Sequence, residues 1–282
     1  MGQWNGIETV EWQGYEWAKH PLWGIAHPDE HTIWMDETLP YINEQGHVVL
    51  GIEKRPREVP MAWPGTGTEY REWARCHMRT VREFKYGTFE WEMKLPNGKY
   101  QWPALWLSSD EDWPPEIDVM EGWSRETTNW IRDCIFLRIK PTMHWRDEKR
   151  VHVSESKRNI LWFRLKRKKN FDKYKVVWTP DYIDVYYNDH RVKRFKDKQM
   201  LREFNRPEIK MHAIMSSGFD DGFTESVFRE WDNDAKNMIV RSFKYTPLPG
   251  FCDTDSLVSK KTENDDQGRK QDATETQASQ LA

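Results

Sequence analysis

The chain has 282 residues, a formal net charge of −3, 17 tryptophans and three cysteines. This length can bury a sizeable core, and single β domains of this size are common. The last 31 residues hold seven acids and four bases, so the rest of the chain is balanced at 39 acids and 39 bases. Such balance gives no reason to expect nucleic acid or an anionic membrane as the main partner.

The first residues of the chain, MGQWNGIETVEWQGYEW, contain no basic segment followed by an apolar one, so no signal peptide is visible. No run elsewhere is long and apolar enough to cross a bilayer. We therefore expect a soluble protein without a membrane partner. Its compartment is unknown from these observations.

Short segments rich in β-branched and aromatic residues recur along the chain and are separated by turn clusters. This regular spacing favours an all-β sandwich or jelly roll. Asn188 and Asp189 tolerate the backbone angles of a tight hairpin turn, and the best short helix candidate is 197–204. The expected strands are 47–52, 87–95, 102–107, 116–121, 134–139, 174–179, 182–188, 191–195, 209–215 and 238–245.

The composition changes after Phe251, the last aromatic residue of the chain. The remaining segment is polar and charged and has no hydrophobic period, so it cannot bury enough apolar surface to offset its ordering entropy. We predict one folded domain over 1–251 and a disordered tail over 252–282.

Three carboxylates crowd into the stretch PPEIDVMEG at 114–122, namely Glu116, Asp118 and Glu121. On a regular strand Glu121 points away from the other two, and on a helix Glu116 does. One surplus residue near Val119 and Met120 returns Glu121 to the common face, because a β-bulge resets the alternation. The alternative is a charged surface loop, since the pattern Glu-x-Asp-x-x-Glu is short.

A common face for these acids would suit the hydrolysis of a glycosidic bond. That reaction uses one carboxyl group to protonate the leaving oxygen and a second to attack the sugar or activate water. On a bulged strand Glu116 and Glu121 can approach the roughly 5 to 5.5 Å separation of retaining enzymes. Asp118 would raise the proton affinity of its neighbours and could hold Glu116 by sharing a proton.

Three motifs in this order resemble glycoside hydrolase family 16, the laminarinase, lichenase, agarase and carrageenase group. They are YGTFEWEMKLP from Tyr86, WPALWL from Trp102 and EIDVME from Glu116. Further similarity in the later strands extends the resemblance over roughly 48–249. Three ordered motifs are much more specific than the acidic cluster alone.

The resemblance implies a concanavalin-like β-jelly roll of two curved antiparallel sheets, with the substrate lying across the concave one. Residues 1–251 would be the catalytic domain of an endo-acting, retaining hydrolase. Glu116 would be its nucleophile, Asp118 the electrostatic assistant and Glu121 the general acid/base. The resemblance also leads us to expect secretion, a monomer and a polysaccharide as the partner.

Four further residues are candidates for binding the substrate. Indole rings stack on sugar faces, and Trp102 is the favoured stacking residue, while core packing is an equal alternative for Trp106. Trp113 is a second stacking candidate because it lies in a loop before the acidic strand. His144 looks like the histidine that relatives place on the next strand, where it would bond a sugar hydroxyl or the acid/base; a surface or structural histidine is the alternative.

We expect no cofactor and no metal site, because no second histidine or cysteine stands at ligand spacing from His144. Arg241 occupies the neighbourhood where calcium-binding relatives often carry an aspartate, which argues against a structural calcium ion. The basic run 164–175 is either a solvated loop or a contact for an acidic polysaccharide.

The favoured substrate is a β-1,3- or mixed β-1,3/1,4-glucan. Alternatives are hydrolysis of a galactan such as agar, porphyran or carrageenan, transfer of the glycosyl group to another sugar, and a non-catalytic lectin on the same fold.

Overall fold

The computed structural model describes residues 2–22, 24–27, 32–61, 67–96, 98–124, 134–157, 160–165, 171–219, 223–229 and 236–251. The strands and helices within these ranges belong to one compact unit, Met1–Thr246. The predicted tail 252–282 and positions 166–170 of the basic run lie outside the described residues.

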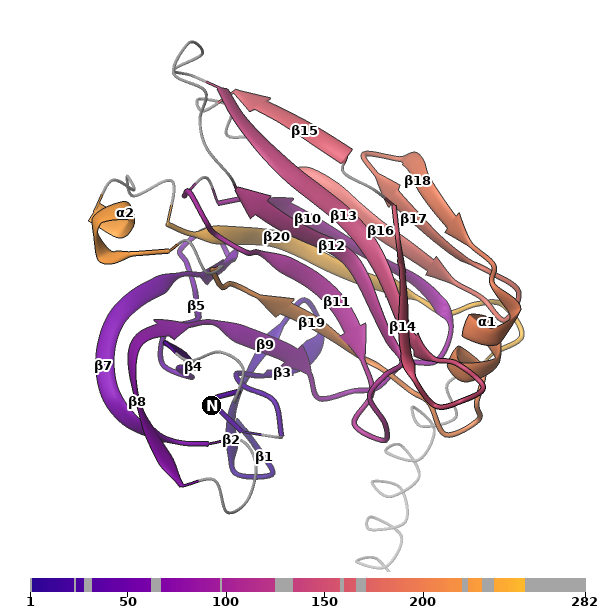
Figure 1. Ribbon diagram of the computed structural model, residues 1–282, viewed down its shortest axis with the longest axis horizontal. Coiled ribbons are helices and arrows are strands. Elements are labelled where there is room, and N and C mark those ends of the chain that lie inside the picture. Colours follow the sequence, from indigo (N-terminus) through magenta and orange to yellow (C-terminus); the bar gives the residue numbers. More distant parts are fainter. Residues whose placement is uncertain are drawn as a thin grey trace, which may run out of the picture. The chain divides into compact units, whose positions relative to one another are not determined.

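Two antiparallel sheets lie face to face, and β12 is an interior strand of the larger one, between β11 and β13 (Figure 1). The ten-stranded sheet contains, in spatial order, β1 (Gly2–Trp4), β2 (Ile7–Trp12), β3 (Tyr15–Ala18), β9 (His77–Thr80), β19 (His212–Ser216), β11 (Ala104–Ser108), β12 (Glu116–Ser124), β13 (Cys134–Arg146) and β14 (His152–Ser156), and β15 (Ile160–Leu165) also pairs with β13. The seven-stranded sheet contains β18 (His190–Phe195), β17 (Ile183–Tyr187), β16 (Asp172–Trp178), β10 (Gly87–Lys94), β20 (Met238–Thr246), β6 (Val48–Leu50) and β5 (Tyr41–Ile42).

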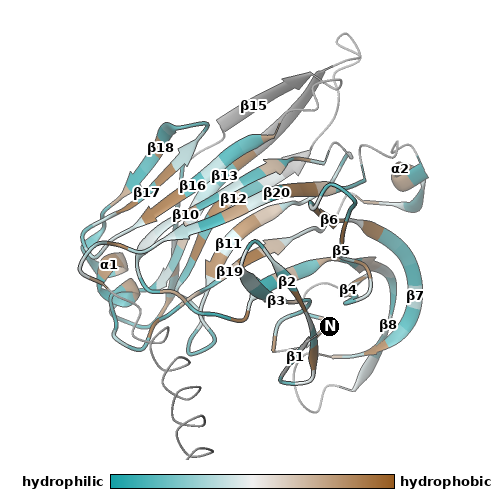
Figure 2. Cartoon of the chain, turned by 180° about the vertical axis from the view of Figure 1, so that it is seen from behind, coloured by the Kyte–Doolittle hydropathy of each residue, from teal (hydrophilic) through white to brown (hydrophobic). Residues whose placement is uncertain are grey.

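The core between these sheets is aromatic. Inward side chains of β10 and β16 alternate with outward ones, and Trp91, Tyr174 and Trp178 are fully buried. Figure 2 shows the same alternation as brown and teal segments along the strands. Alternation of this kind is what a sheet with one buried face requires. The prediction of a two-sheet jelly roll is confirmed.

A third, three-stranded sheet was not predicted. It contains β4 (Ile33–Met35), β8 (Thr68–Arg75) and β7 (Ile52–Pro60), and β4 runs parallel to β8. The longest of these strands, β7, reads IEKRPREVP and exposes most of its side chains, so it lacks the hydrophobic alternation that marks a strand. β7 and β8 bend strongly in Figure 1, and Trp73 of β8 packs against Phe219, Phe223 and Phe228.

Both helices within the described residues are short. α1 (Lys198–Phe204) matches the predicted helix, and the carboxylate of Asp197 accepts hydrogen bonds from the first backbone N–H groups, as an N-cap does. α2 (Glu225–Arg229) was not predicted. In the part of the chain that is described, no helix is long and apolar enough to cross a membrane.

Most predicted strands coincide with observed ones, and the β17 to β18 turn has positive φ at both Asn188 and Asp189, as predicted. β13 is longer than predicted, because it continues through Pro141 to Arg146. β19 begins three residues later than predicted, at His212.

Candidate active site

The predicted bulge lies in β12, which pairs with β11 on one side and with β13 on the other. Asp118 pairs with Thr142 of β13 and Glu121 pairs with Lys140, so Val119 and Met120 together occupy the place of one residue on the partner strand. The pairing with β11 shifts at the same point. This surplus residue is the irregularity that brings the third acid to the side of the other two.

The bulge is tied to the opposite sheet. The hydroxyl of Tyr187 in β17 donates a 3.0 Å hydrogen bond to the carbonyl oxygen of Val119. Both residues are almost completely buried, and a buried carbonyl displaced from its ladder needs another partner. Tyr187 was not identified from the sequence, because the contact joins residues 68 positions apart.

A cleft of about 370 Å³ opens over β11 and β12, and all three acids line it. Glu121 therefore faces the cleft rather than the interior of the sandwich. The other lining residues are His27, Met35, Arg75, His77, Trp102, Ala104, Trp106 and Ser216.

Glu121 is held at both carboxylate oxygens. Trp102 Nε1 donates to its Oε1 and Thr142 Oγ1 donates to its Oε2, each at 3.3 Å. Burial raises the pKa of Glu121, and Lys140 and His144 partly oppose this. An upward shift of the pKa is the direction that a general acid needs.

Glu116 has a different set of partners. Trp113 Nε1 donates to Glu116 Oε2 at 3.0 Å, and His144 Nε2 lies 4.0 Å from Glu116 Oε1. Burial and the charge of Asp118 raise the pKa of Glu116 to about 8, while His144 and Trp113 act in the opposite direction. A positive charge on His144 would therefore favour the ionised form of Glu116.

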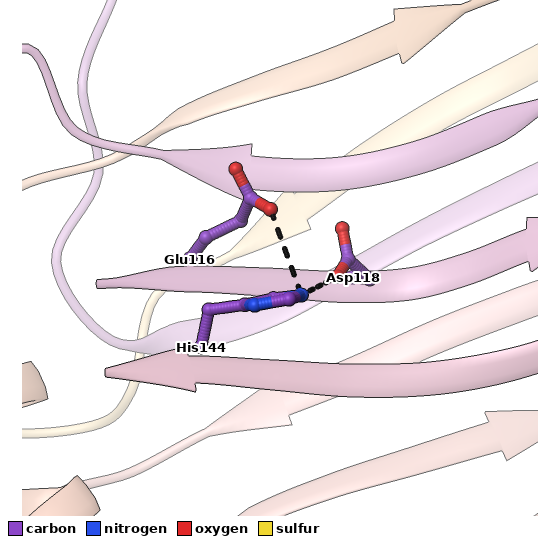
Figure 3. A group of neighbouring side chains, drawn as sticks. All are labelled: Glu116, Asp118 and His144. Atoms are coloured by element: carbon purple, nitrogen blue, oxygen red, sulfur yellow. Dashed lines mark ion pairs between the residues drawn. The ribbon is translucent and has the colours of Figure 1, made fainter. Parts of the chain in front are cut away.

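Asp118 is the most enclosed of the three acids, with 4% of its surface exposed. His144 Nε2 lies 3.0 Å from Asp118 Oδ2, although this contact lacks the alignment of a hydrogen bond. Figure 3 marks this ion pair with a dashed line. Burial and the charge of Glu121 raise the pKa of Asp118 well above its ordinary value. Three acids this close in a low-dielectric site retain protons between them rather than ionising together.

Glu116, Asp118 and His144 each offer one possible ligand atom, all within 4.8 Å of one another. Such a group could meet a cation. Here His144 already contacts Asp118 through the nitrogen that would bind a metal, so we interpret the group as an ion pair within an acid/base site.

Trp102 and Trp106 both line the cleft, together with Ala104 between them. Ala104 and Trp106 are two positions apart on β11 and so share one face of this strand, while Trp102 precedes the strand. Trp106 donates through Nε1 to Ser216 Oγ at 3.1 Å and meets the His77 ring edge-on, with centroids 5.8 Å apart. Since Trp106 is only half-buried and borders the cleft, core packing does not describe its position.

Trp113 and His144 lie on the other side of β12 from Trp106 and contact the acids directly. Trp113 is half exposed, and its ring packs against His152 of β14 with centroids 5.1 Å apart. His144 contacts Asp118 and faces Glu116, and does not hydrogen-bond to Glu121 as one prediction proposed.

The loop that carries Trp113 is fixed by an ion cluster that the sequence did not reveal. Asp112 accepts from Arg146 at 2.8 Å, from Arg150 at 3.2 Å and from Arg206 at 2.9 Å. These arginines come from β13, the turn after it and the segment after α1, so only the fold brings them together.

Sequence reasoning also missed Thr142 and His152 at the site. Thr142 precedes His144 by two residues on β13 and so shares its face, a signal that strand alternation provides. His152 carried no local signal, because its position beside His144 depends on the register between β13 and β14.

Comparison with known proteins agrees with this geometry. The chain matches the family model for glycosyl hydrolases family 16 over residues 28–241. It is 31% identical over 113 residues to the endo-1,3-1,4-beta-glycanase EglC of Rhizobium meliloti, covering 39% of this chain and 21% of that protein. It is 27% identical over 147 residues to a beta-glucanase of Rhodothermus marinus, covering 49% of this chain and 46% of that protein. The chain thus spans less than half the length of these curated relatives.

Solved structures show the same fold. The laminarinase catalytic domain from Thermotoga maritima superposes with a TM-score of 0.55 at 18% identity, over 82% of this chain and 91% of that chain. Porphyranase B from Zobellia galactanivorans superposes with a TM-score of 0.59 at 13% identity, over 84% of this chain and 87% of that chain. The family match covers residues 28–241 and includes the bulged strand with the three acids. The chain therefore belongs to glycosyl hydrolases family 16.

Proposed function

We propose that the protein is an endo-acting, retaining glycoside hydrolase. The observation that carries this proposal is the bulge in β12, which directs Glu116, Asp118 and Glu121 into one cleft with different partners. Two acids of one strand can then take the separate roles that double displacement needs.

In this reaction Glu121 donates its proton to the leaving glycosidic oxygen while Glu116 attacks the anomeric carbon, giving a covalent glycosyl-enzyme. Water then releases the sugar, with Glu121 as the base. Burial and the charge of Glu121 raise the pKa of Asp118, which limits the negative charge beside Glu116. A protonated His144 stabilises the ionised nucleophile.

The proposed substrate is a β-1,3- or mixed β-1,3/1,4-glucan. Support comes from the similarity to proteins named endo-1,3-1,4-beta-glycanase and beta-glucanase. Trp102 and Trp106 offer apolar ring faces to a neutral sugar along the cleft.

The second candidate function is the hydrolysis of a galactan, or the transfer of a glycosyl group to another sugar. Arg75 lines the cleft and supplies a guanidinium group, which pairs well with sulfate or carboxylate. The similarity to porphyranase B is compatible with this alternative.

We further propose a secreted monomer without cofactor. The residues do not fit a structural calcium ion at Arg241, because its Nε and Nη2 donate to Glu92 Oε2 at 2.9 and 2.7 Å. A guanidinium group at this position supplies a positive charge where a calcium site requires oxygen ligands.

The test is a panel of purified polysaccharides, covering laminarin, mixed-linkage glucan, agar, porphyran and carrageenan, assayed for new reducing ends. Glucan cleavage with a shift to shorter oligosaccharides supports the proposal, and galactan cleavage supports the alternative. Binding without cleavage of any polysaccharide would show a lectin. The Glu116→Gln variant is the matched control for contaminating activity.

A further inference from the structure

The edge strand β14 places a second histidine against the site. His152 pairs with Arg146 in register, which sets it diagonally across from His144 on the same face. His152 Nε2 lies 2.8 Å from His144 Nδ1, and the two rings are stacked at 29° with centroids 5.1 Å apart. A hydrogen bond of this length orients both rings.

Both nitrogens of His144 are therefore engaged. Nε2 lies 3.0 Å from Asp118 Oδ2 and 4.0 Å from Glu116 Oε1, and negative charge on these groups favours the tautomer of His144 with its proton on Nε2. In neutral His144 the other nitrogen, Nδ1, must then accept a hydrogen bond from the N–H group of His152 Nε2. When His144 gains a second proton, Nδ1 donates and His152 accepts through the same atom.

His152 is also in contact with the loop that holds Glu116. Its ring packs on Trp113, whose Nε1 donates to the same carboxylate that His144 faces. His152 thus contacts both Trp113 and His144, the two residues that approach the carboxylate of Glu116. A displacement of His152 therefore affects both of these contacts with the proposed nucleophile.

The surroundings of the pair disfavour a positive charge on His152. His144 faces Glu116 and Asp118 of β12, and it also acts on Glu121. Burial, the charge of His144 and that of Arg146 lower the pKa of His152, and Arg146 is itself paired with Asp112.

We propose that His152 is a positioning residue that fixes the ring plane of His144, with the proton on Nε2 directed at the catalytic carboxylates. This inference rests on the proposed function for its kinetic consequences. Without a nitrogen at position 152, His144 rotates and its Nε2 proton no longer opposes the charge of Glu116. The nucleophile then ionises only at higher pH.

The experiment compares His152→Phe, which keeps a ring without nitrogen, with His152→Gln, whose side-chain amide can donate or accept near the same place. His152→Phe is expected to lower kcat about fivefold to fiftyfold with KM little changed, and to move the acidic limb of the pH profile upward. His152→Gln should recover most of the rate. His190→Phe, at an exposed histidine of β18, is the matched control and should change neither.

Two further measurements keep the inference testable if the variants or the activity fail. A His144→Ala, His152→Phe double variant should be no slower than His144→Ala alone, because His152 acts through His144. Imidazole ¹⁵N NMR of the wild type should show the Nε2–H tautomer at His144, and His152→Phe should change it. An unchanged tautomer, or equal rates in His152→Phe and wild type, overturns the inference. Absence of activity with the expected NMR change would instead contradict the proposed function alone.

Discussion

Tyr187 in the seven-stranded sheet donates a hydrogen bond of 3.0 Å to the carbonyl of Val119, within the bulge that separates Asp118 from Glu121. This bond joins the two sheets at the point where β12 departs from regular pairing with β13. The irregularity that aligns the acids is therefore supported from the core.

Removing this hydroxyl should loosen the bulge. Tyr187→Phe leaves a buried carbonyl without a partner, which is expected to cost about 1–3 kcal/mol in the free energy of unfolding. Urea denaturation measures the loss, and kcat should fall as Glu121 loses its fixed position. Tyr186→Phe, which removes a half-exposed hydroxyl bonded to Asp184 on the same strand, is the control. Equal stability of Tyr187→Phe and wild type would contradict a supporting role for this bond.

Glu116→Gln and Glu121→Gln should each lower cleavage by about a thousandfold or more while the fold remains intact, because each removes one of the two carboxyl roles. Azide should partly rescue Glu116→Ala by attacking the sugar in place of the missing carboxylate. Reducing-end assays and circular dichroism provide the measurements. Glu111→Gln, an exposed carboxylate five residues earlier, should keep the wild-type rate. Wild-type turnover in the catalytic variants would rule out this site.

The carboxyl group of Glu116 should make the free energy of unfolding depend on pH. The folded pKa of Glu116, about 8, lies above the ordinary value of 4.5, so between these values the folded state binds more protons than the unfolded state. Stability from this group is complete below pH 4.5 and is lost as pH rises through 8. The Glu116→Gln variant has no carboxyl group to ionise, so it does not lose stability in this way. It should be about 1–3 kcal/mol more stable than wild type at pH 8, with little difference at pH 4.

Thermal unfolding at both pH values checks this expectation. Glu111→Gln again serves as the comparison, because its exposed side chain is not in the cleft. A Glu116→Gln variant that melts below the wild type at pH 8 would show that the carboxylate is not destabilised by its surroundings.

Trp102 combines two interactions, since it lines the cleft and donates to Glu121. Trp102→Phe keeps an aromatic face but loses the N–H group that lowers the pKa of Glu121. The pKa should rise, so the alkaline limb of the pH–rate profile should move to higher pH and kcat should fall. Trp106→Phe should raise KM without moving the alkaline limb of the pH–rate profile, because the N–H group of Trp106 donates to Ser216 and not to an acid. Identical pH profiles for the Trp102 variant and the wild type would exclude this coupling.

Chelation should leave the protein unchanged. Because Arg241 is paired with Glu92, EDTA is expected to shift neither the melting temperature nor the rate, and added calcium should restore nothing. A drop in melting temperature on EDTA treatment that calcium reverses would show a metal site elsewhere in the protein.

The sequence by itself determined the two-sheet fold, the bulge and the three acids. Each of these is encoded within a few neighbouring residues, through the period of two along a strand and the single surplus position at Val119 and Met120.

Only the tertiary structure decided what surrounds the acids. Tyr187 reaches the bulge from the opposite sheet, Thr142 and His152 arrive through strand register, and three arginines converge on Asp112 from separate segments. Burial, which raises the pKa of all three acids, is likewise a property of the packed sheets. A short sequence window records alternation along one strand, but hydrogen-bond partners and local dielectric depend on residues that are distant in sequence.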